Sequence, residues 1–407
     1  MLKNKNVKIF LSLSLLILML SFNFMTNFLS TDTIGGLSFS YFQGDSENLV
    51  IAKMNYDKFE EKRGDCDYGL CMYDNNTRTF SGYRSQFGLQ GYVFSFLINI
   101  VKKVQILRIF TSLALATVLV LICYFISKKY DKLLGIIFYG TFFFSPWVIA
   151  FARNLYWVPF TWFTPCLLGL LLSLYRKKKK IIIPLIYLSI LIKCLCGYEY
   201  ITTIMLSTIV FFIIDLFVER ENKKRIVILK TIFVVGIVCL LGFGTALMIH
   251  GYKRGSGDIV EGIESIYKTD VLRRTIITTD KHNYTGIYRE SMDASVADVI
   301  KLYVYNWNTD IVYGVDKKLF PVMIFITFIV CIINIIENYK YKKRDFVMFM
   351  IFLITTLSWL ILGKSHSYIH THMNYVLWYF GFIQVCFYII IKFIFNNLHK
   401  IKVKGEI

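Results

Sequence analysis

The sequence predicts an all-α polytopic membrane protein with about ten transmembrane helices. Hydrophobic residues make up 56% of the 407 positions, and they occur in runs of about twenty rather than in amphipathic stripes. A helix needs about twenty apolar residues to cross roughly 30 Å of hydrocarbon. Lys and Arg gather in alternate short connections between the runs, which is typical of cytoplasmic loops.

The first apolar run covers about residues 9–29 and follows Lys3, Lys5 and Lys8. It looks like a signal peptide, but it is longer than the usual apolar core and no small-x-small cleavage site follows it. We therefore expect an uncleaved first transmembrane helix that runs from the inside to the outside.

Nine further apolar runs are long enough, or nearly so, to cross the membrane. They lie near residues 104–127, 132–151, 157–175, 181–197, 201–218, 226–249, 318–337, 345–363 and 373–397. Residues 89–101 are too short for a span and lie too close to Lys102 and Lys103, so we expect them to follow the interface or to lead obliquely into the next span. We interpret residues 1–407 as a single transmembrane domain.

Charge fixes the predicted orientation. Every second connection is basic, as short cytoplasmic loops should be. These connections lie at 128–132, 176–180, 220–230 and 340–344, with a basic tail at 400–404. Two long extracytoplasmic loops remain, at 30–103 and 250–317, and both termini fall in the cytoplasm. Because the basic residues follow the topology, the net charge of +19 does not indicate a nucleic-acid partner.

Two cysteines stand apart from the other seven. Cys66 and Cys71 lie among turn-prone residues of the first long loop, outside the reducing cytosol, and we expect a disulfide, with two free thiols as the alternative. The remaining cysteines lie in apolar runs, where Cys usually packs as a small hydrophobic residue. They are Cys123, Cys166, Cys194, Cys196, Cys239, Cys331 and Cys386.

Acidic residues stand out about fifteen residues after the first span, in Gly44-Asp45-Ser46-Glu47, at the start of a predicted helix. Here the chain resembles the GT-C glycosyltransferases. Many of those enzymes carry an acidic motif soon after the first transmembrane helix, in a long external loop. The resemblance covers about the first 200 residues and includes 83–90, where such enzymes re-enter the membrane, and 152–157 at an external turn.

The resemblance implies a GT-C-like fold and transfer of a sugar from a polyprenyl-phosphate donor to an extracytoplasmic glycan or lipid-linked acceptor. Cellular chemistry points the same way, because sugar nucleotides are confined to the cytosol and an external transferase needs a donor delivered through the bilayer. The expected partners are this donor, the acceptor and membrane lipids. The sequence contains no Gly-rich phosphate loop, Gly-x-Ser-x-Gly elbow or His-Glu-x-x-His motif of a soluble enzyme.

Such a transfer needs a carboxylate base and cations that hold the phosphate. Asp45 is the first candidate base and Glu47 the second; the alternative role for Asp45 is a helix cap. Arg84 and Arg153 are candidate donor-phosphate ligands because the guanidinium fork donates two hydrogen bonds at once. Ordinary loop solvation of Arg84 and interfacial anchoring of Arg153 are the alternatives.

Three of the six histidines fall within residues 366–372, next to Lys364. We expect Lys364, His366 and His370 to contact the donor phosphate or sugar. The i, i+4 spacing of the two histidines also suits a divalent metal, but no local Asp, Glu or Cys completes a tetrahedral site, so we assign no metal ligand. A divalent metal cofactor stays as an alternative.

Glu199 is an acid among apolar residues, which suggests a substrate-site role, although Lys193 could simply neutralise it. The second long loop carries a mixed charge set that we expect to cover the cavity or contact the acceptor. This set comprises Arg254, Lys268, Arg273, Arg274, Asp280, His282, Arg289 and Glu290.

Two other functions compete. An O-antigen-type polysaccharide polymerase or ligase also has a large external loop, and would place its chemistry in the second loop. A transporter or lipid flippase should show internally related halves and charged residues at mid-membrane depth. Neither pattern is clear in this sequence.

The predicted topology can be tested by cysteine labelling. On a background without native cysteines, single cysteines in the two long loops should react with an impermeant thiol reagent in intact cells. A cysteine at Lys178 should react only after the membrane is opened. Labelling at Lys178 in intact cells would invert the topology.

Overall fold

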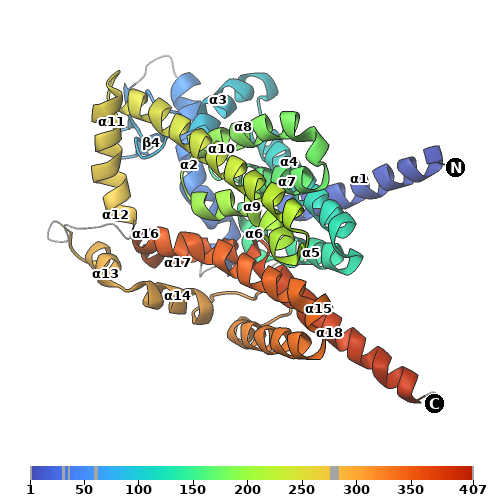
Figure 1. Ribbon diagram of the computed structural model, residues 1–407. Helices are drawn as coiled ribbons and strands as arrows, with labels where there is room; N and C mark the ends of the chain where they lie inside the picture. Colours follow the sequence, from blue (N-terminus) through green and yellow to red (C-terminus); the bar gives the residue numbers. More distant parts are fainter. Residues whose placement is uncertain (1, 30–32, 35–36, 59–62, 276–283, 406–407) are drawn as a thin grey trace.

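The structure is a computed structural model that describes residues 2–29, 33–34, 37–58, 63–275 and 284–405. Helices dominate it (Figure 1), and the predicted all-α membrane class is confirmed. Within the described residues, six helical segments are long and apolar enough to cross a membrane. They are Asn6–Thr26 in α1 (Leu2–Thr26), α4 (Val104–Lys129), α9 (Ile201–Val218), α10 (Asn222–Arg254), and Leu319–Ile336 and Lys343–Leu362 in α15 (Leu319–Leu362).

Two bent helix pairs raise this number to eight if each pair is one span. The first joins α5 (Lys132–Phe144) and α6 (Pro146–Ala152) at 66°, and the second joins Thr371–Tyr379 to Phe382–Leu398 at 48°. The first bend has a local cause. Pro146 has no N–H to continue α5, and the Ser145 hydroxyl caps the new helix by accepting from the Val148 N–H at 3.1 Å.

Two of the ten expected segments are helices that fall short of a span on length or composition. α7 (Phe160–Leu174) has only 15 residues. α8 (Lys179–Cys196) has 18 residues, but three of them are lysines. Both nevertheless pack against the longer helices: α7 contacts α4, α8 and α9, and α8 contacts α10.

α15 folds back on itself. The rings of Phe328 and Phe349 lie 6.4 Å apart, although 21 residues separate them. A straight helix would place them about 30 Å apart. Phe349 also packs at 5.4 Å against Phe382, the first residue of α18 (Phe382–Gly405). The two halves of α15 are therefore antiparallel neighbours, as expected for the separate runs 318–337 and 345–363.

The first long loop contains α2 (Phe39–Lys58), small strands and α3 (Leu89–Val101). β1 (Thr33–Ile34) pairs with β2 (Leu37–Ser38), and a second sheet has the order β3-β5-β4. Its strands are β3 (Gly64–Asp65), β4 (Cys71–Asp74) and β5 (Thr79–Gly82). α3 coincides with the segment that was predicted to be too short for a span, and it packs against α2.

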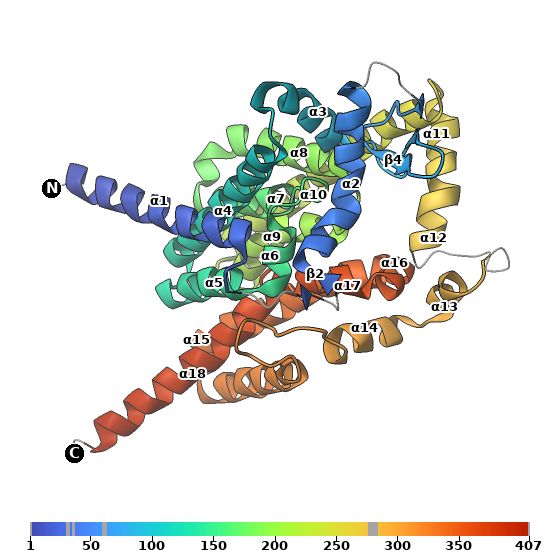
Figure 2. The same cartoon turned by 180° about the vertical axis from the view of Figure 1, so that it is seen from behind.

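Short helices form the second long loop and the connection that precedes α18. The loop contains α11 (Ile259–Ile266), η2 (Tyr267–Val271), α12 (Leu272–Arg274), α13 (Ile287–Asp293) and α14 (Val296–Tyr305). The later connection contains α16 (Lys364–Ile369), α17 (Thr371–Asn374) and η3 (Tyr375–Tyr379). These helices gather with α2 and β4 on one side of the molecule, and both termini project away from α11 and α12 (Figures 1 and 2).

Cys66 and Cys71 are joined in a disulfide, with their Cα atoms 5.7 Å apart. The bond ties the start of β4 to the chain that follows β3, beneath α2. The other seven cysteines are buried and free.

Closing so short a loop should stabilise the segment around β4 by about 2 kcal/mol through chain entropy. Mass spectrometry of unreduced, rapidly alkylated protein should recover one peptide pair joined through Cys66 and Cys71. Replacing both residues by Ala should increase amide exchange in β4 and β5 and leave α9 unchanged. Two alkylated thiols in the untreated protein would reject the bond.

Candidate functional site

A cavity of about 750 Å³ opens where the two long loops meet. Ser46 and Leu49 of α2 form one wall, and residues of η2, α12 and α13 form another. The remaining lining comes from β4, the end of β5 and the connection to α3, the α6–α7 connection, Glu199, the last turn of α10, and the segment from α16 to α17. Of the residues predicted for the site, Arg84, Glu199, His366 and His370 line this cavity together.

The cavity lies at one end of the helical bundle. Glu199 precedes the first residue of α9, whereas Asp215 lies in its last turn, and Arg254 ends α10. The 18 residues of α9 separate its two ends by about 27 Å. The basic connection 220–230 follows α9, so the cavity and this connection lie at opposite ends of one membrane-length helix.

Asp270 organises the cations of the cavity. Its Oδ2 accepts from Arg254 Nη1 at 2.6 Å, and its Oδ1 lies 3.4 Å from Arg274 Nη2 and 3.9 Å from Arg273 Nη2. Arg254 also donates to the backbone oxygen of Arg84 at 2.9 Å. Four arginines and the two carboxylates of Glu199 and Asp270 line the cavity, which leaves a formal surplus of two positive charges.

Glu199 belongs to a second polar group. Gln86 Nε2 donates to Glu199 Oε1 at 2.5 Å and to the Tyr156 hydroxyl at 2.8 Å. Arg274 lies 3.8 Å from the same carboxylate, whereas Lys193 donates to the Gly197 oxygen. Burial, followed by the charge of Glu199, raises the pKa of Tyr156, so its phenol stays protonated.

Gly197 lets the chain approach this group closely. A Cβ atom at this position would lie 2.6 Å from Glu199 Oε2 and 2.9 Å from Gln86 Oε1. Any side chain here would displace the carboxylate or the amide, so glycine is required for the observed geometry.

Three histidine rings contact one another along the cavity wall, in tilted and edge-on arrangements. The ring centroids of His366 and His370 lie 4.5 Å apart, and those of His370 and His372 lie 5.7 Å apart. Burial and then the neighbouring His372 lower the pKa of His370 to about 4, and burial lowers that of His366 as well. Both rings are therefore neutral near pH 7, which suits them to hydrogen bonds with hydroxyl groups. Nδ1 of His366 has no hydrogen-bond partner within the described residues.

Three predicted residues do not line the cavity. Glu47 is buried, pairs with Arg108 at 2.5 Å and accepts from the Leu155 N–H at 3.1 Å. Arg153 donates to the Met25 oxygen at 2.9 Å. Lys364 donates to the oxygens of Met292 and Ala294, each at 2.7 Å. Their contacts connect segments of the fold.

α2 begins at Phe39, so the predicted helix start at residues 44–47 and the helix-cap alternative for Asp45 are wrong. Asp45 lies within α2, and its side chain is outside the described part of the structure. Asp280 and His282 of the predicted charge set also lie outside the described residues. The next residue after Asp45, Ser46, lines the cavity, so the motif reaches it. Within the described residues, no group of three or more His, Cys, Asp or Glu side chains is arranged to hold a metal ion.

Sequence reasoning did not single out Asp270 or Tyr156. A signal for Asp270 was present, because Arg273 and Arg274 follow it at the i+3 and i+4 positions, where helical side chains meet. Tyr156 carried no such signal, since its role depends on Gln86, which lies 70 residues earlier in the chain.

A smaller cavity of about 600 Å³ adjoins the first and shares Leu49 and Met72 with it. Asn48 and Asn55 of α2, seven residues apart on one helix face, contribute to its lining together with Asn75. Tyr73 and Phe80 add aromatic surface, with their rings 4.7 Å apart. Amides next to aromatic faces can bind a polar molecule that also has apolar C–H faces, such as a sugar.

Comparisons with known proteins found no family model, curated protein or solved structure that matches the chain.

The lowered pKa of His370 predicts acid sensitivity. Between pH 6.5 and about 4, His370 is protonated in the unfolded chain but neutral in the native protein. The native state therefore loses stability relative to the unfolded state as the pH falls through this window. Each pKa unit of difference between the two states changes the free energy of unfolding by about 1.4 kcal/mol, so the loss across this window is at most about 3 kcal/mol. Thermal unfolding in detergent from pH 7.5 to 4.5 should therefore show a shallower acid loss for His370→Asn than for the wild type. Parallel curves for the two proteins would contradict the assignment.

Proposed function

We propose that this chain is a GT-C-like membrane glycosyltransferase, which moves a sugar from a polyprenyl-phosphate donor to an extracytoplasmic glycan or lipid-linked acceptor. The observation that carries the proposal is the cavity that Arg84, Arg254, Arg273 and Arg274 line together with Glu199. The cavity contains both cations that can bind a phosphate and neutral hydrogen-bonding groups that can bind a sugar.

The proposal includes a multi-pass topology of ten spans in the cell membrane, with both termini in the cytoplasm. α7 and α8 complete the count, because α7 packs against α4 and α9, and α8 packs against α7 and α10 while its other face exposes apolar side chains such as Ile181 and Leu188. Lys179 and Lys180, at the start of α8, can extend to the cytoplasmic interface. The cavity then faces the extracytoplasmic side, where a lipid-linked donor is the available source of activated sugar.

In the proposed reaction, an acceptor oxygen forms a bond to the anomeric carbon while the bond from that carbon to the donor phosphate oxygen breaks. The departing polyprenyl phosphate keeps the electron pair, and its charge changes from one negative to nearly two. Arginine forks stabilise this charge, and Asp270 positions three of them. The base takes the acceptor proton.

Asp45 remains the proposed base because it lies next to Ser46, which lines the cavity. Glu199 and Asp270 are less suited to this role, since each carboxylate already lies beside cavity arginines. Neutral His366, His370 and Tyr156 can bind sugar hydroxyls. The adjoining cavity of Asn48, Asn55 and Asn75 is the proposed place of the acceptor.

One observation favours the O-antigen-type polymerase or ligase as a second candidate. Arg254, Asp270, Arg273 and Arg274 all belong to the end of α10 or the second long loop, where that class would place its chemistry. The donor separates the two functions, since the polymerase or ligase would use a glycan on a lipid diphosphate, whereas the transferase uses a single sugar on a lipid monophosphate.

The test is Asp45→Asn in purified protein, assayed with a panel of polyprenyl-phosphate sugars. Transfer should fall by about two to four orders of magnitude, because Asn cannot accept the proton, while binding of polyprenyl phosphate should stay near normal. If Asp45 serves only the structure of α2, in which it lies six residues after the first residue, Asn should support near-native transfer. Activity within a few fold of the wild type would remove Asp45 from the mechanism.

Arg273→Gln and Glu47→Gln provide matched comparisons. Arg273→Gln should raise the KM for the donor at least tenfold, since a charge-assisted hydrogen bond contributes about 1.5–3 kcal/mol. Glu47→Gln should lower thermal stability by breaking the pair with Arg108, with transfer per folded molecule retained. Turnover with lipid diphosphate glycans alone would replace the transferase by the polymerase or ligase.

A further inference from the structure

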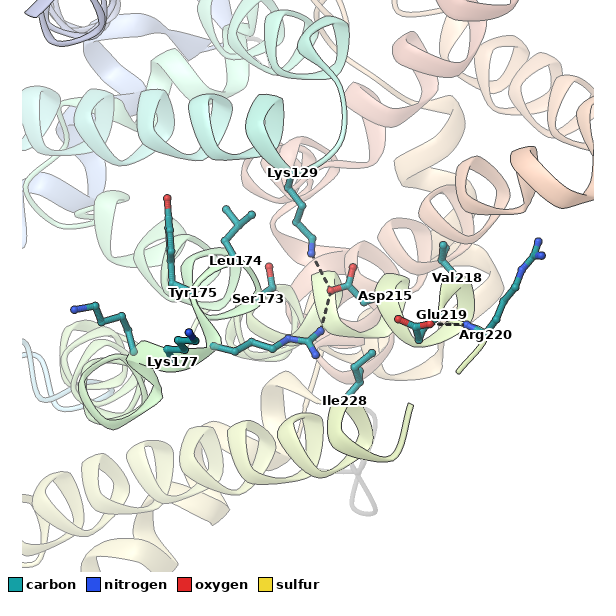
Figure 3. Close-up of a pocket in the computed structure, with 12 residues that line it drawn as sticks. Lys129, Ser173, Leu174, Tyr175, Lys177, Asp215, Val218, Glu219, Arg220 and Ile228 are labelled. Atoms are coloured by element: carbon teal, nitrogen blue, oxygen red, sulfur yellow. Dashed lines mark hydrogen bonds and ion pairs between the residues drawn. The ribbon is translucent and has the colours of Figure 1, made fainter. Parts of the chain in front are cut away.

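A second charged cavity, of about 930 Å³, lies at the end of α9 opposite the candidate active site (Figure 3). It forms where the last turns of α4, α7 and α9 meet η1 (Arg176–Lys178) and the first turns of α10. Nothing in the proposed transfer reaction uses these residues. They are Lys129, Ser173, Leu174, Tyr175, Arg176, Lys177, Lys178, Asp215, Val218, Glu219, Arg220 and Ile228.

The cavity carries a surplus of positive charge. Five cations and two carboxylates line it, which leaves three formal positive charges. Asp215 Oδ2 lies 2.8 Å from Lys129 Nζ and 3.6 Å from Arg176 Nη2, so this carboxylate joins α9 to α4 and η1. The side chains of Lys129 and Asp215 are only 10% and 20% exposed, so this pair belongs to the packed wall of the cavity.

Lys177 and Lys178 differ from that pair. Both are exposed at the cavity, and neither forms an ion pair with a carboxylate that the structure describes. Glu219 is occupied locally, because its Oε1 accepts from the backbone N–H groups of Arg220 and Glu221 at 2.9 and 3.1 Å. The two lysines thus keep their charge available for an anion from outside the chain.

Apolar surface adjoins these cations. Leu174, Val218 and Ile228 line the same cavity, and Val218 is 44% exposed. Phe217 and Val227 beside them are about half exposed as well. A free phosphate ion gains nothing from apolar surface, whereas the acyl chains of a lipid are stabilised by burial against it.

We propose that this cavity binds the head group of an anionic phospholipid, with Lys177 and Lys178 on the phosphate and the acyl chains against Val218 and Ile228. Basic pockets between membrane helices on the cytoplasmic side recognise anionic head groups. Lys129, Asp215 and Arg176 hold the walls in place. The proposal requires membrane embedding but does not depend on glycosyl transfer.

The basic run itself supplies a matched control. Lys179 and Lys180 continue the run of Lys177 and Lys178 but do not line the cavity. If the run served only to orient the chain, all four lysines would be equivalent. A head-group site instead predicts that only the first two matter for lipid affinity.

The experiment titrates delipidated full-length protein in detergent with phosphatidylglycerol or phosphatidylcholine and measures binding by native mass spectrometry. Phosphatidylglycerol should bind at least tenfold more tightly than phosphatidylcholine. Lys177→Ala/Lys178→Ala should remove most of this preference, whereas Lys179→Ala/Lys180→Ala should change it by less than twofold. Lys178→Gln alone serves if the double variant is not recovered folded, and should lower the affinity several fold.

Three outcomes would overturn the proposal. The first is an equal loss in the two double variants, which would indicate a general charge effect. The second is equal binding of the two lipids by the wild type. In the third, inorganic phosphate or glycerol phosphate competes with phosphatidylglycerol at equal concentration, which would identify a site for a free anion rather than for a lipid.

Discussion

The carboxylate of Asp270 allows three arginines to share one cavity. Charges about 4 Å apart interact by roughly 4 kcal/mol at an effective dielectric constant of 20, so the arginines would separate if no anion lay between them. Asp270 supplies that anion from η2, and its contact with Arg254 ties the second long loop to the end of α10. The surplus charge then remains concentrated near Glu199 rather than spreading over the surface.

This arrangement depends in turn on close backbone packing. Gly197 brings the end of α8 against Gln86 and Glu199, and a Cβ atom would not fit. Gln86 uses its amide to connect Glu199 with Tyr156, so three segments that are distant in sequence meet through one side chain. Neutral histidines line the same cavity, because burial, followed by the neighbouring histidines and arginines, disfavours their protonation.

The sequence predicted those parts of the molecule that local patterns determine. Hydropathy located the spans that correspond to α9 and α10. The short apolar run at 89–101 was predicted not to span the membrane, and α3 is indeed shorter than the candidate spans. The patterns could not distinguish a cavity residue from a structural one. Glu47 and Lys364 were predicted as site residues because they are charged residues next to apolar runs. In the structure Glu47 pairs with Arg108, and Lys364 donates to two backbone oxygens, and all of these partners lie more than 60 residues away in the sequence. Long-range pairing of this kind leaves no periodicity in one sequence.

The pair of Glu47 with Arg108 gives the two walls of the cavity unequal stiffness. α2 is held near its middle by the pair of buried Glu47 with Arg108 and by the Leu155 N–H, and it also packs against β4, which the disulfide anchors. The wall of η2 and α12 carries ion pairs, among them Asp270 with Arg254 and Arg274 with Glu199, in which a bound anion can replace the carboxylate. A molecule that binds in this cavity would therefore meet one wall with internal anchors and one wall whose charged contacts it can replace.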